Sequence, residues 1–227
     1  MSMVKIENLT KIYEVEKNKI YALRNVSFTI QKGEFIILFG PSGSGKTTLL
    51  LLLGAIIKPT SGKILFGKTD ITTFSEDDGA EWRHNNVGFV FQKINLIDFL
   101  NVLENVTLPR YTSNEPFDKV EERAIELIKR VGLAKRINHK PAQLSVGEQQ
   151  RVAIARALIG NPQIVLADEP TSHLDTETGT KIVKLMKELN SEFGTTLVVS
   201  THDPEIAKLA TRIIHIRDGR IVKKEDR

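Results

Sequence analysis

Short apolar runs alternate with longer stretches of helical periodicity along most of the chain. Four apolar runs are predicted to be buried strands, at residues 35–39, 87–91, 164–167 and 197–200. Between the last two, apolar residues recur with the period of one helix face: Ile182, Val183, Met186, Leu189 and Phe193. Gly194 then marks the end of this helix. Buried strands alternating with helices predict an α/β core with a mainly parallel sheet.

Two regions depart from this alternation. Residues 4–30 and 63–69 have the pattern of strands joined by turns, which predicts a small N-terminal antiparallel β lobe. Residues from about 92 to 159 are helical in pattern, and one apolar face there consists of Val120, Ala124, Leu127, Ile128 and Val131. Near the end, Asp218-Gly219 is typical of a hairpin turn. We expect a single domain over residues 1–227 with an inserted helical lobe at about 92–159.

Composition narrows the class of protein. The chain has 227 residues, of which 41% are hydrophobic and 26% charged, as expected for a globular domain with a core. It has no cysteine, which excludes disulfides and cysteine nucleophiles and favours the cytoplasm. The net charge of +4 comes from interspersed acidic and basic residues, so no nucleic-acid partner is expected. The longest apolar run, 49–57, is shorter than the roughly 20 residues of a spanning helix.

A glycine-rich loop follows the first predicted core strand. Residues 40–47, GPSGSGKT, match the G-x-x-x-x-G-K-[ST] pattern and precede an apolar helix expected to begin near Thr48. Its backbone N–H groups can surround a phosphate, Lys46 can reach the β- and γ-phosphates, and the Thr47 hydroxyl can bind magnesium. The predicted nucleotide-binding residues are therefore Gly40, Pro41, Ser42, Gly43, Ser44, Gly45, Lys46, Thr47 and Thr48.

An acidic pair, Asp168-Glu169, follows the predicted strand 164–167. Ligands bind at the carboxyl edge of open α/β sheets, so this pair is expected beside the glycine-rich loop. Asp168 would hold magnesium directly or through water, and Glu169 would orient and polarise the attacking water. The two motifs together predict a P-loop NTPase core that hydrolyses ATP with Mg²⁺.

A third motif, LSVGEQQR at residues 144–151, lies between these two. Other motifs accompany it in a fixed order: Gln92 after a strand, Ser172-His173-Leu174-Asp175 after Glu169, and His202 after the last core strand. This ordered set resembles the ATP-binding-cassette (ABC) ATPases, whose signature is Leu-Ser-Gly-Gly-Gln. The resemblance covers essentially the whole chain.

The resemblance implies a site shared between two chains. In this family two copies pack head to tail, and each ATP lies between the phosphate loop of one copy and the signature of the other. Ser145 and Gly147 would then offer a hydroxyl and a backbone N–H to the γ-phosphate. The family also implies roles at four further positions: Gln92 contacts magnesium or the attacking water, Asp175 communicates across the dimer, His202 holds the γ-phosphate, and Tyr13 stacks on adenine. The expected catalytic residues are Lys46, Gln92, Glu169 and His202, and the expected metal ligands are Thr47, Gln92 and Asp168.

The signature departs from the family pattern at two positions. Val146 replaces the first glycine, and Glu148 replaces glutamine. These changes bring a β-branched side chain and a negative charge close to an anion, so they are expected to weaken contact with the second face of the nucleotide. Hydrolysis is still expected.

The segment 95–106 resembles that of stand-alone ATPase subunits in the lipoprotein-releasing and macrolide-export branch. There a short helix of the membrane subunit docks in a groove of the helical lobe. Residues 96–99 are candidates for the groove wall, or alternatively belong to the lobe's own core. The resemblance implies a cytoplasmic homodimer at the inner face of the cell membrane, whose ATP-driven closure powers separate transmembrane permease subunits for export or substrate extraction.

Two other functions stay open at this point. One is a soluble cassette ATPase of the iron–sulfur assembly or repair type, although the long coiled-coil insertion of the repair proteins is missing. The other is a regulatory cassette that binds ATP without hydrolysing it. The presence of Lys46, Glu169 and His202 argues against the second alternative.

Overall fold

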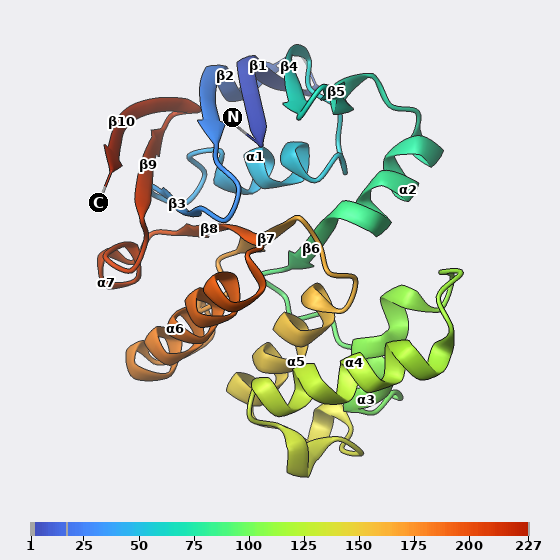
Figure 1. Ribbon diagram of the computed structural model, residues 1–227. Coiled ribbons are helices and arrows are strands. Elements are labelled where there is room, and N and C mark those ends of the chain that lie inside the picture. Colours follow the sequence, from blue (N-terminus) through green and yellow to red (C-terminus); the bar gives the residue numbers. More distant parts are fainter. Residues whose placement is uncertain (1–2, 17, 227) are drawn as a thin grey trace.

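The computed structural model describes residues 3–16 and 18–226 and contains two sheets (Figure 1). The larger sheet has six strands in the order β10-β9-β3-β8-β7-β6. Its strands are β3 (Phe35–Phe39), β6 (Val87–Val90), β7 (Ile164–Asp168), β8 (Thr196–Thr201), β9 (Arg212–Arg217) and β10 (Arg220–Asp226). All neighbours pair in parallel except β9 and β10. The predicted mainly parallel α/β core is confirmed.

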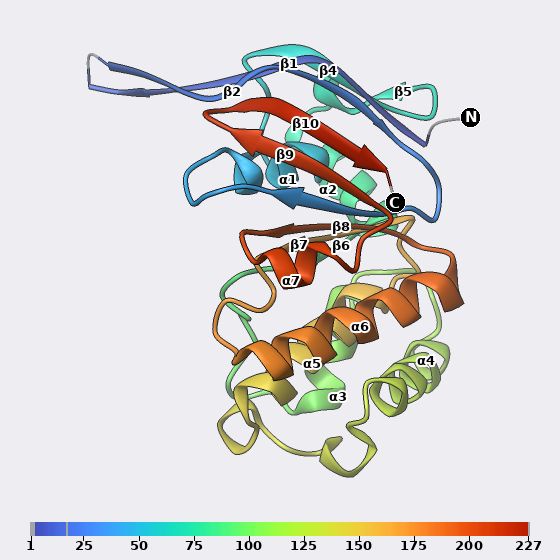
Figure 2. The same ribbon diagram turned by 90° about the vertical axis from the view of Figure 1, so that its left-hand side faces the viewer.

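The N-terminal strands form a separate antiparallel sheet with the order β2-β1-β4-β5. It consists of β1 (Val4–Val15), β2 (Asn18–Ile30), β4 (Ser61–Phe66) and β5 (Thr69–Asp70). Helix α1 (Lys46–Leu53) lies between this sheet and the core sheet (Figure 2). It begins two residues before the expected start at Thr48, so the glycine-rich loop continues directly into the helix.

The two faces of the core sheet pack in different clusters because strand residues alternate in direction. Ile36 and Leu38 pack with α1 and the N-terminal sheet, whereas Phe35 and Ile37 pack with the helices of the opposite side. Those helices are α3 (Val102–Thr107), α4 (Phe117–Arg130), α5 (Val146–Leu158), α6 (Thr176–Phe193) and the short α7 (Pro204–Ala207). Both faces of the sheet are therefore covered, as apolar parallel strands require.

Helices α3, α4 and α5 form the helical lobe, which lies to one side of the core sheet (Figure 1). The predicted apolar face of α4 is buried, including Val131 directly after the helix. In α6 four of the five periodic residues are buried, whereas Phe193, in the last turn, is 44% exposed. Gly194 ends α6 with a φ of 63°, as predicted. No helix in the described part of the chain has the length and apolar character to span a membrane.

The sequence pattern predicted neither the short α7 nor the helix that precedes β6. Helix α2 (Glu76–Asn86) is mostly polar, so it lacks the apolar periodicity that reveals a helix in a sequence. Its start is stabilised by reciprocal hydrogen bonds between Ser75 and Asp78, which form a capping box. The helix leads directly into β6, the edge strand beside β7.

Candidate active site

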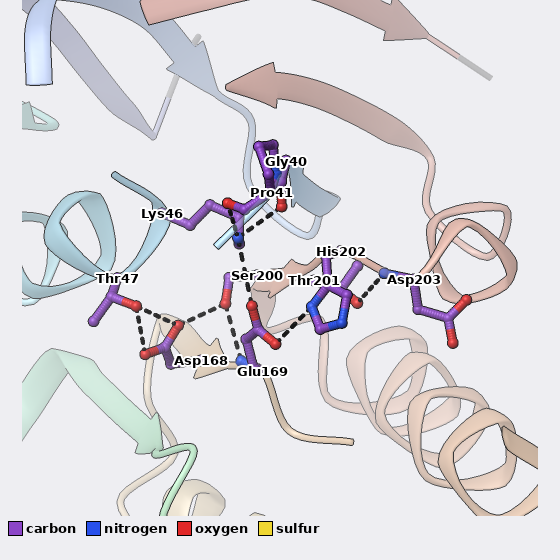
Figure 3. A network of polar contacts seen from close by, with 10 residues as sticks. All are labelled: Gly40, Pro41, Lys46, Thr47, Asp168, Glu169, Ser200, Thr201, His202 and Asp203. Carbon is purple, nitrogen blue, oxygen red and sulfur yellow. Dashed lines mark hydrogen bonds and ion pairs between the residues drawn. The ribbon is translucent and has the colours of Figure 1, made fainter. Parts of the chain in front are cut away.

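The order of the core strands brings distant motifs to one edge of the sheet. Strand β8 lies between β3 and β7, and parallel pairing puts the carboxyl ends of all three strands side by side. The glycine-rich loop after β3, the Asp168-Glu169 pair at the end of β7 and His202 after β8 therefore converge (Figure 3). They occupy the position where ligands bind in open α/β sheets.

The glycine-rich loop is closed around the Lys46 side chain. The Lys46 ammonium donates hydrogen bonds to the carbonyl oxygens of Gly40 and Pro41 at 2.7 and 2.9 Å, and the residue is only 4% exposed. The Ser44 hydroxyl is buried and has no hydrogen-bond partner among the described residues. Such a group in a glycine-rich loop at the start of a helix fits a phosphate oxygen.

Strand β2 and the turn between β9 and β10 lie against the loop. Gly45 has a φ of 104°, and a Cβ there would lie 2.3 Å from the carbonyl oxygen of Ala22 in β2. The turn between β9 and β10 contributes Gly219, whose N–H donates to the Ser44 carbonyl at 3.1 Å. The Gly219 carbonyl in turn accepts from the Arg24 N–H at 2.7 Å. The loop is thus held by segments from both ends of the chain.

A hydroxyl on each side orients the Asp168 carboxylate. Thr47 Oγ1 donates to it, with distances of 2.8 and 3.0 Å to the two oxygens, and Ser200 Oγ donates to Oδ1 at 2.6 Å. Asp168 is 7% exposed. Magnesium usually takes one or two protein oxygens and completes its shell with phosphate and water. Thr47 and Asp168 fit such a site, which supports their predicted role as metal ligands.

Glu169 lies between two nitrogen groups. Its carboxylate is 3.4 Å from the Lys46 ammonium and 2.9 Å from Nδ1 of His202. The Glu169 N–H donates to Ser200 Oγ at 2.9 Å, and its φ of 42° is uncommon for a residue with a side chain. Backbone and side chain are therefore both held in place, as a water-orienting carboxylate requires.

Sequence reasoning missed Ser200 and Gly219. Ser200 is fully buried and joins Asp168 to Glu169 through one hydroxyl. A polar residue near the end of an otherwise apolar strand was the available signal, but strand order was needed to place it beside β7. Gly219 had been assigned only to a hairpin turn, and nothing in its sequence context indicates contact with the glycine-rich loop.

The predicted signature residues lie elsewhere, at a hollow of about 700 Å³ that none of the residues 40–47 lines. Ser145, Gly147 and Asp175 line it together with His173 and Thr178. Ser145 caps α5 and Asp175 caps α6, and hydrogen bonding by Thr178, first through its backbone N–H, lowers the pKa of the Asp175 carboxyl. A Cβ on Gly147 would lie 3.2 Å from the Thr178 side chain, so this glycine also lets α5 approach α6 closely.

The two remaining predicted residues are exposed. Tyr13 is 38% exposed on β1, with the Lys11 ammonium 5.2 Å from its ring centroid, so its ring is accessible for stacking. Gln92 is exposed on the segment that follows β6, the strand that neighbours β7. The structure therefore brings together Lys46, Thr47, Asp168, Glu169 and His202, and leaves the signature residues on a different surface of the same chain.

Known proteins resemble this chain in sequence and in fold. A family model described as ABC transporter matches residues 23–172. An uncharacterized ABC transporter ATP-binding protein of Methanocaldococcus jannaschii is 47% identical, covering 98% of this chain and 97% of its own. A lipoprotein-releasing system ATP-binding protein of Idiomarina loihiensis is 41% identical, covering 99% and 98%. The dimeric post-hydrolysis structure of the ATP-binding cassette MJ0796, bound to ADP and Pi, superposes with a TM-score of 0.90 at 46% identity, covering 99% of this chain and 98% of that one.

Proposed function

Because this chain belongs to the ABC transporter ATPase family, we propose that it is the ATP-hydrolysing subunit of a transporter whose membrane-spanning subunits are separate chains. Its relatives include a lipoprotein-releasing ATP-binding protein of nearly the same length, which supports export or substrate extraction. The chain is an ATPase cassette that binds ATP and uses Mg²⁺, and cassettes of this type form dimers.

One observation carries the proposal: the hydrolytic groups and the signature lie on separate surfaces of one chain. Lys46 and His202 both contact Glu169, whereas Ser145 and Gly147 line the hollow beside α6. A nucleotide on the glycine-rich loop therefore meets the signature only when a second chain supplies it. This is the head-to-tail arrangement that the sequence predicts.

We assign each residue a step that its contacts allow. Lys46 gives up its hydrogen bonds to the Gly40 and Pro41 carbonyls and binds phosphate oxygens instead. Glu169 orients the attacking water through one carboxylate oxygen, and His202 holds the other carboxylate oxygen of Glu169. Thr47 and Asp168 would hold Mg²⁺, which offsets the phosphate charge during hydrolysis. Gln92, exposed on the segment after β6, would complete this set by contacting Mg²⁺ or the attacking water.

Closure of the dimer would act as the power stroke. ATP contacts both chains only in the closed form, so it shifts the population toward that form. Changing a mostly open population into a mostly closed one requires about 5 kcal/mol of differential binding, which several phosphate contacts across the interface can supply. Hydrolysis removes the γ-phosphate contacts and lets the dimer open.

Mixing two inactive variants tests the shared site. Each shared site consists of the glycine-rich loop of one chain and the signature of its partner. Lys46→Ala removes a phosphate contact of the glycine-rich loop, and Ser145→Ala removes a phosphate contact of the signature. A mixed dimer places both defects in one site and leaves the second site intact. We expect each variant alone to be inactive. A mixed dimer should hydrolyse ATP at about half the rate of a dimer with two intact sites, and the rate of the mixture should rise in proportion to the fraction of mixed dimers. Rates are measured as phosphate release against protein concentration.

Two results would contradict the shared site. One is an unmixed Ser145→Ala variant that hydrolyses ATP normally, and the other is a natural chain whose rate per molecule does not depend on concentration. Glu169→Gln serves as the control for binding, because it removes the carboxylate that orients water and retains the phosphate-binding residues. It is expected to bind ATP and to accumulate as a stable dimer.

The contact with a membrane subunit is proposed at the junction of β6 and the helical lobe. A hollow of about 300 Å³ lies there, lined by Phe89, Phe91, Asn95, Arg110 and Arg156 among others. Of the predicted wall residues, Leu96 packs against the core, whereas Phe99 is 75% exposed. The core alternative therefore applies to Leu96, whereas a place in the docking surface stays a proposal for Phe99, which does not line this hollow itself.

Phe99→Asp tests this docking surface. The change places a charge on an exposed apolar side chain, so it is expected to reduce co-sedimentation of the chain with membranes that contain its permease subunits at least about tenfold. ATP-dependent dimer formation should be unchanged. Phe193→Asp is the matched control, because Phe193 is also exposed but lies at the end of α6. Equal loss in both variants, or no loss in either, would count against this surface.

A further inference from the structure

The signature glutamate occupies the groups that a phosphate would use. Glu148 Oε2 accepts hydrogen bonds from the Ser145 N–H at 2.8 Å and from the Ser145 hydroxyl at 3.0 Å. The Ser145 hydroxyl also accepts from the Glu148 N–H at 3.3 Å. This capping box stabilises the start of α5. It also places a carboxylate oxygen on the side of Ser145 where an anion would bind.

An arginine from outside the helix contacts this carboxylate. Arg136, in the short 3₁₀ segment Ala134–Arg136, has its Nε 3.2 Å from Glu148 Oε1. Its guanidinium also lies 3.2 Å from Nε2 of His139. Hydrogen bonds from the Ser145 backbone and hydroxyl, and the Arg136 charge, hold the pKa of Glu148 below its usual value. Glu148 is therefore ionised at neutral pH, with Arg136 as its counter-charge.

The Ser145 hydroxyl cannot serve both anions at once. It has a single proton to donate, and that proton is directed at Glu148. A γ-phosphate on the partner subunit can take it only if Glu148 releases it. Two anions then share a small region, and the strength of their repulsion depends on whether a cation stays beside Glu148.

We propose that Arg136 is a positioning residue of the shared site, which holds and neutralises Glu148 so that Ser145 can donate to the γ-phosphate bound by a second copy of the chain. The inference rests on the proposed function, because it requires a nucleotide at the signature. The proposal makes the role of Arg136 depend on Glu148: with this glutamate in the signature, ATP-driven closure of the dimer requires Arg136. With an uncharged residue at position 148, it does not.

A double-mutant cycle tests this dependence. Four chains are compared in a Glu169→Gln background that does not hydrolyse ATP: the parent, Arg136→Gln, Glu148→Gln and the double variant. The readout is the ATP concentration that half-saturates dimer formation, measured by sedimentation at low salt. When Glu148 is present, we expect Arg136→Gln to raise the half-saturating ATP concentration about tenfold. In chains that also carry Glu148→Gln, the same change should alter this concentration less than about twofold, a coupling typical of contacting charges. High salt should reduce the difference, because screening weakens the charge interaction.

The controls separate this role from general effects. Lys5→Gln removes a cation of similar exposure, whose carboxylate partner at 2.5 Å is Glu7 in the N-terminal sheet, and it should leave dimer formation unchanged. Equal losses from Arg136→Gln in both backgrounds would overturn the proposal, because Arg136 would then act independently of Glu148. So would no loss in either background. If the parent itself forms no dimer with ATP, the shared site fails and this inference fails with it.

Discussion

Ser200 connects the two acidic residues of the site through one buried hydroxyl. Its proton goes to Asp168, and its oxygen accepts from the Glu169 N–H. The hydroxyl therefore fixes both the direction of the Asp168 carboxylate, the proposed metal ligand, and the uncommon backbone angle of Glu169. Groups that orient metal ligands commonly affect affinity or activity about 10- to 100-fold when they are removed.

Ser200→Ala is expected to lower hydrolysis about 10- to 100-fold and to raise the Mg²⁺ concentration needed for half-maximal rate, while ATP binding changes little. It also leaves the Glu169 N–H without its partner, which costs about 1–3 kcal/mol of folding stability. The measurement is phosphate release over a Mg²⁺ titration. Thr107→Ala is the control, because Thr107 is a buried hydroxyl that bonds to helix carbonyls in the helical lobe. A similar loss of rate in both variants would show that stability alone explains the effect.

Helix α2 meets the helical lobe at His84, close to the end of the helix. Its ring Nε2 is 3.0 Å from Arg110 Nη1, and its carbonyl accepts from the same nitrogen at 3.2 Å. Arg110 also lies 3.9 Å from Glu115, which pairs with Arg123 at 2.6 Å. Burial first, and then the Arg110 charge, lower the pKa of His84 below its usual value of 6.5. The contact between these elements therefore favours a neutral histidine.

The pH dependence of stability follows from this direction. The unfolded chain binds a proton at His84 more readily than the folded chain, so stability is complete above about pH 6.5 and is lost as the pH falls from there through the lower folded value. We expect the melting temperature to fall between pH 7 and pH 5.5 by a few degrees more in the natural chain than in His84→Gln. His173→Gln, on the surface, should keep the full decline. Identical profiles for the natural chain and His84→Gln would contradict this role.

The whole molecule responds to ATP in two stages that can be separated. A single chain has a complete glycine-rich loop, with Lys46 and Thr47 in place, so it can bind nucleotide alone. The signature surface becomes useful only in a dimer. Nucleotide binding should therefore stabilise the monomer first, and the dimer should add a further term that depends on protein concentration.

ATP without Mg²⁺ at about 100 times its Kd adds roughly 2.7 kcal/mol of stability. For a domain of this size the melting temperature then rises by about 5–11 °C. Ser145→Ala should keep this rise and lose its dependence on protein concentration, whereas Lys46→Ala should lose the rise itself. Scanning calorimetry at several protein concentrations distinguishes the two. A rise that persists in Lys46→Ala would mean that ATP binds outside the glycine-rich loop.

Much of the fold was readable from local pattern. Apolar runs identified the core strands, helical periodicity identified α4 and most of α6, and Gly194 marked a helix end, because burial and backbone conformation impose those residue types wherever they occur. The glycine-rich loop and the acidic pair were equally visible. The polar helix α2 was not visible, since it lacks the apolar period, and Phe193 follows that period and is nevertheless exposed.

The tertiary structure decided which of these residues meet. Strand order in the core sheet placed Ser200 between Asp168 and Glu169 and brought Gly219 to the glycine-rich loop. The approach of β2 from the other sheet leaves room only for a glycine at position 45, because of the Ala22 carbonyl. It also set Arg136 against Glu148, twelve residues further along the chain. Local pattern depends on the residue and its near neighbours, but such contacts depend on how separate elements pack. They arise only when the sheet and its helices assemble.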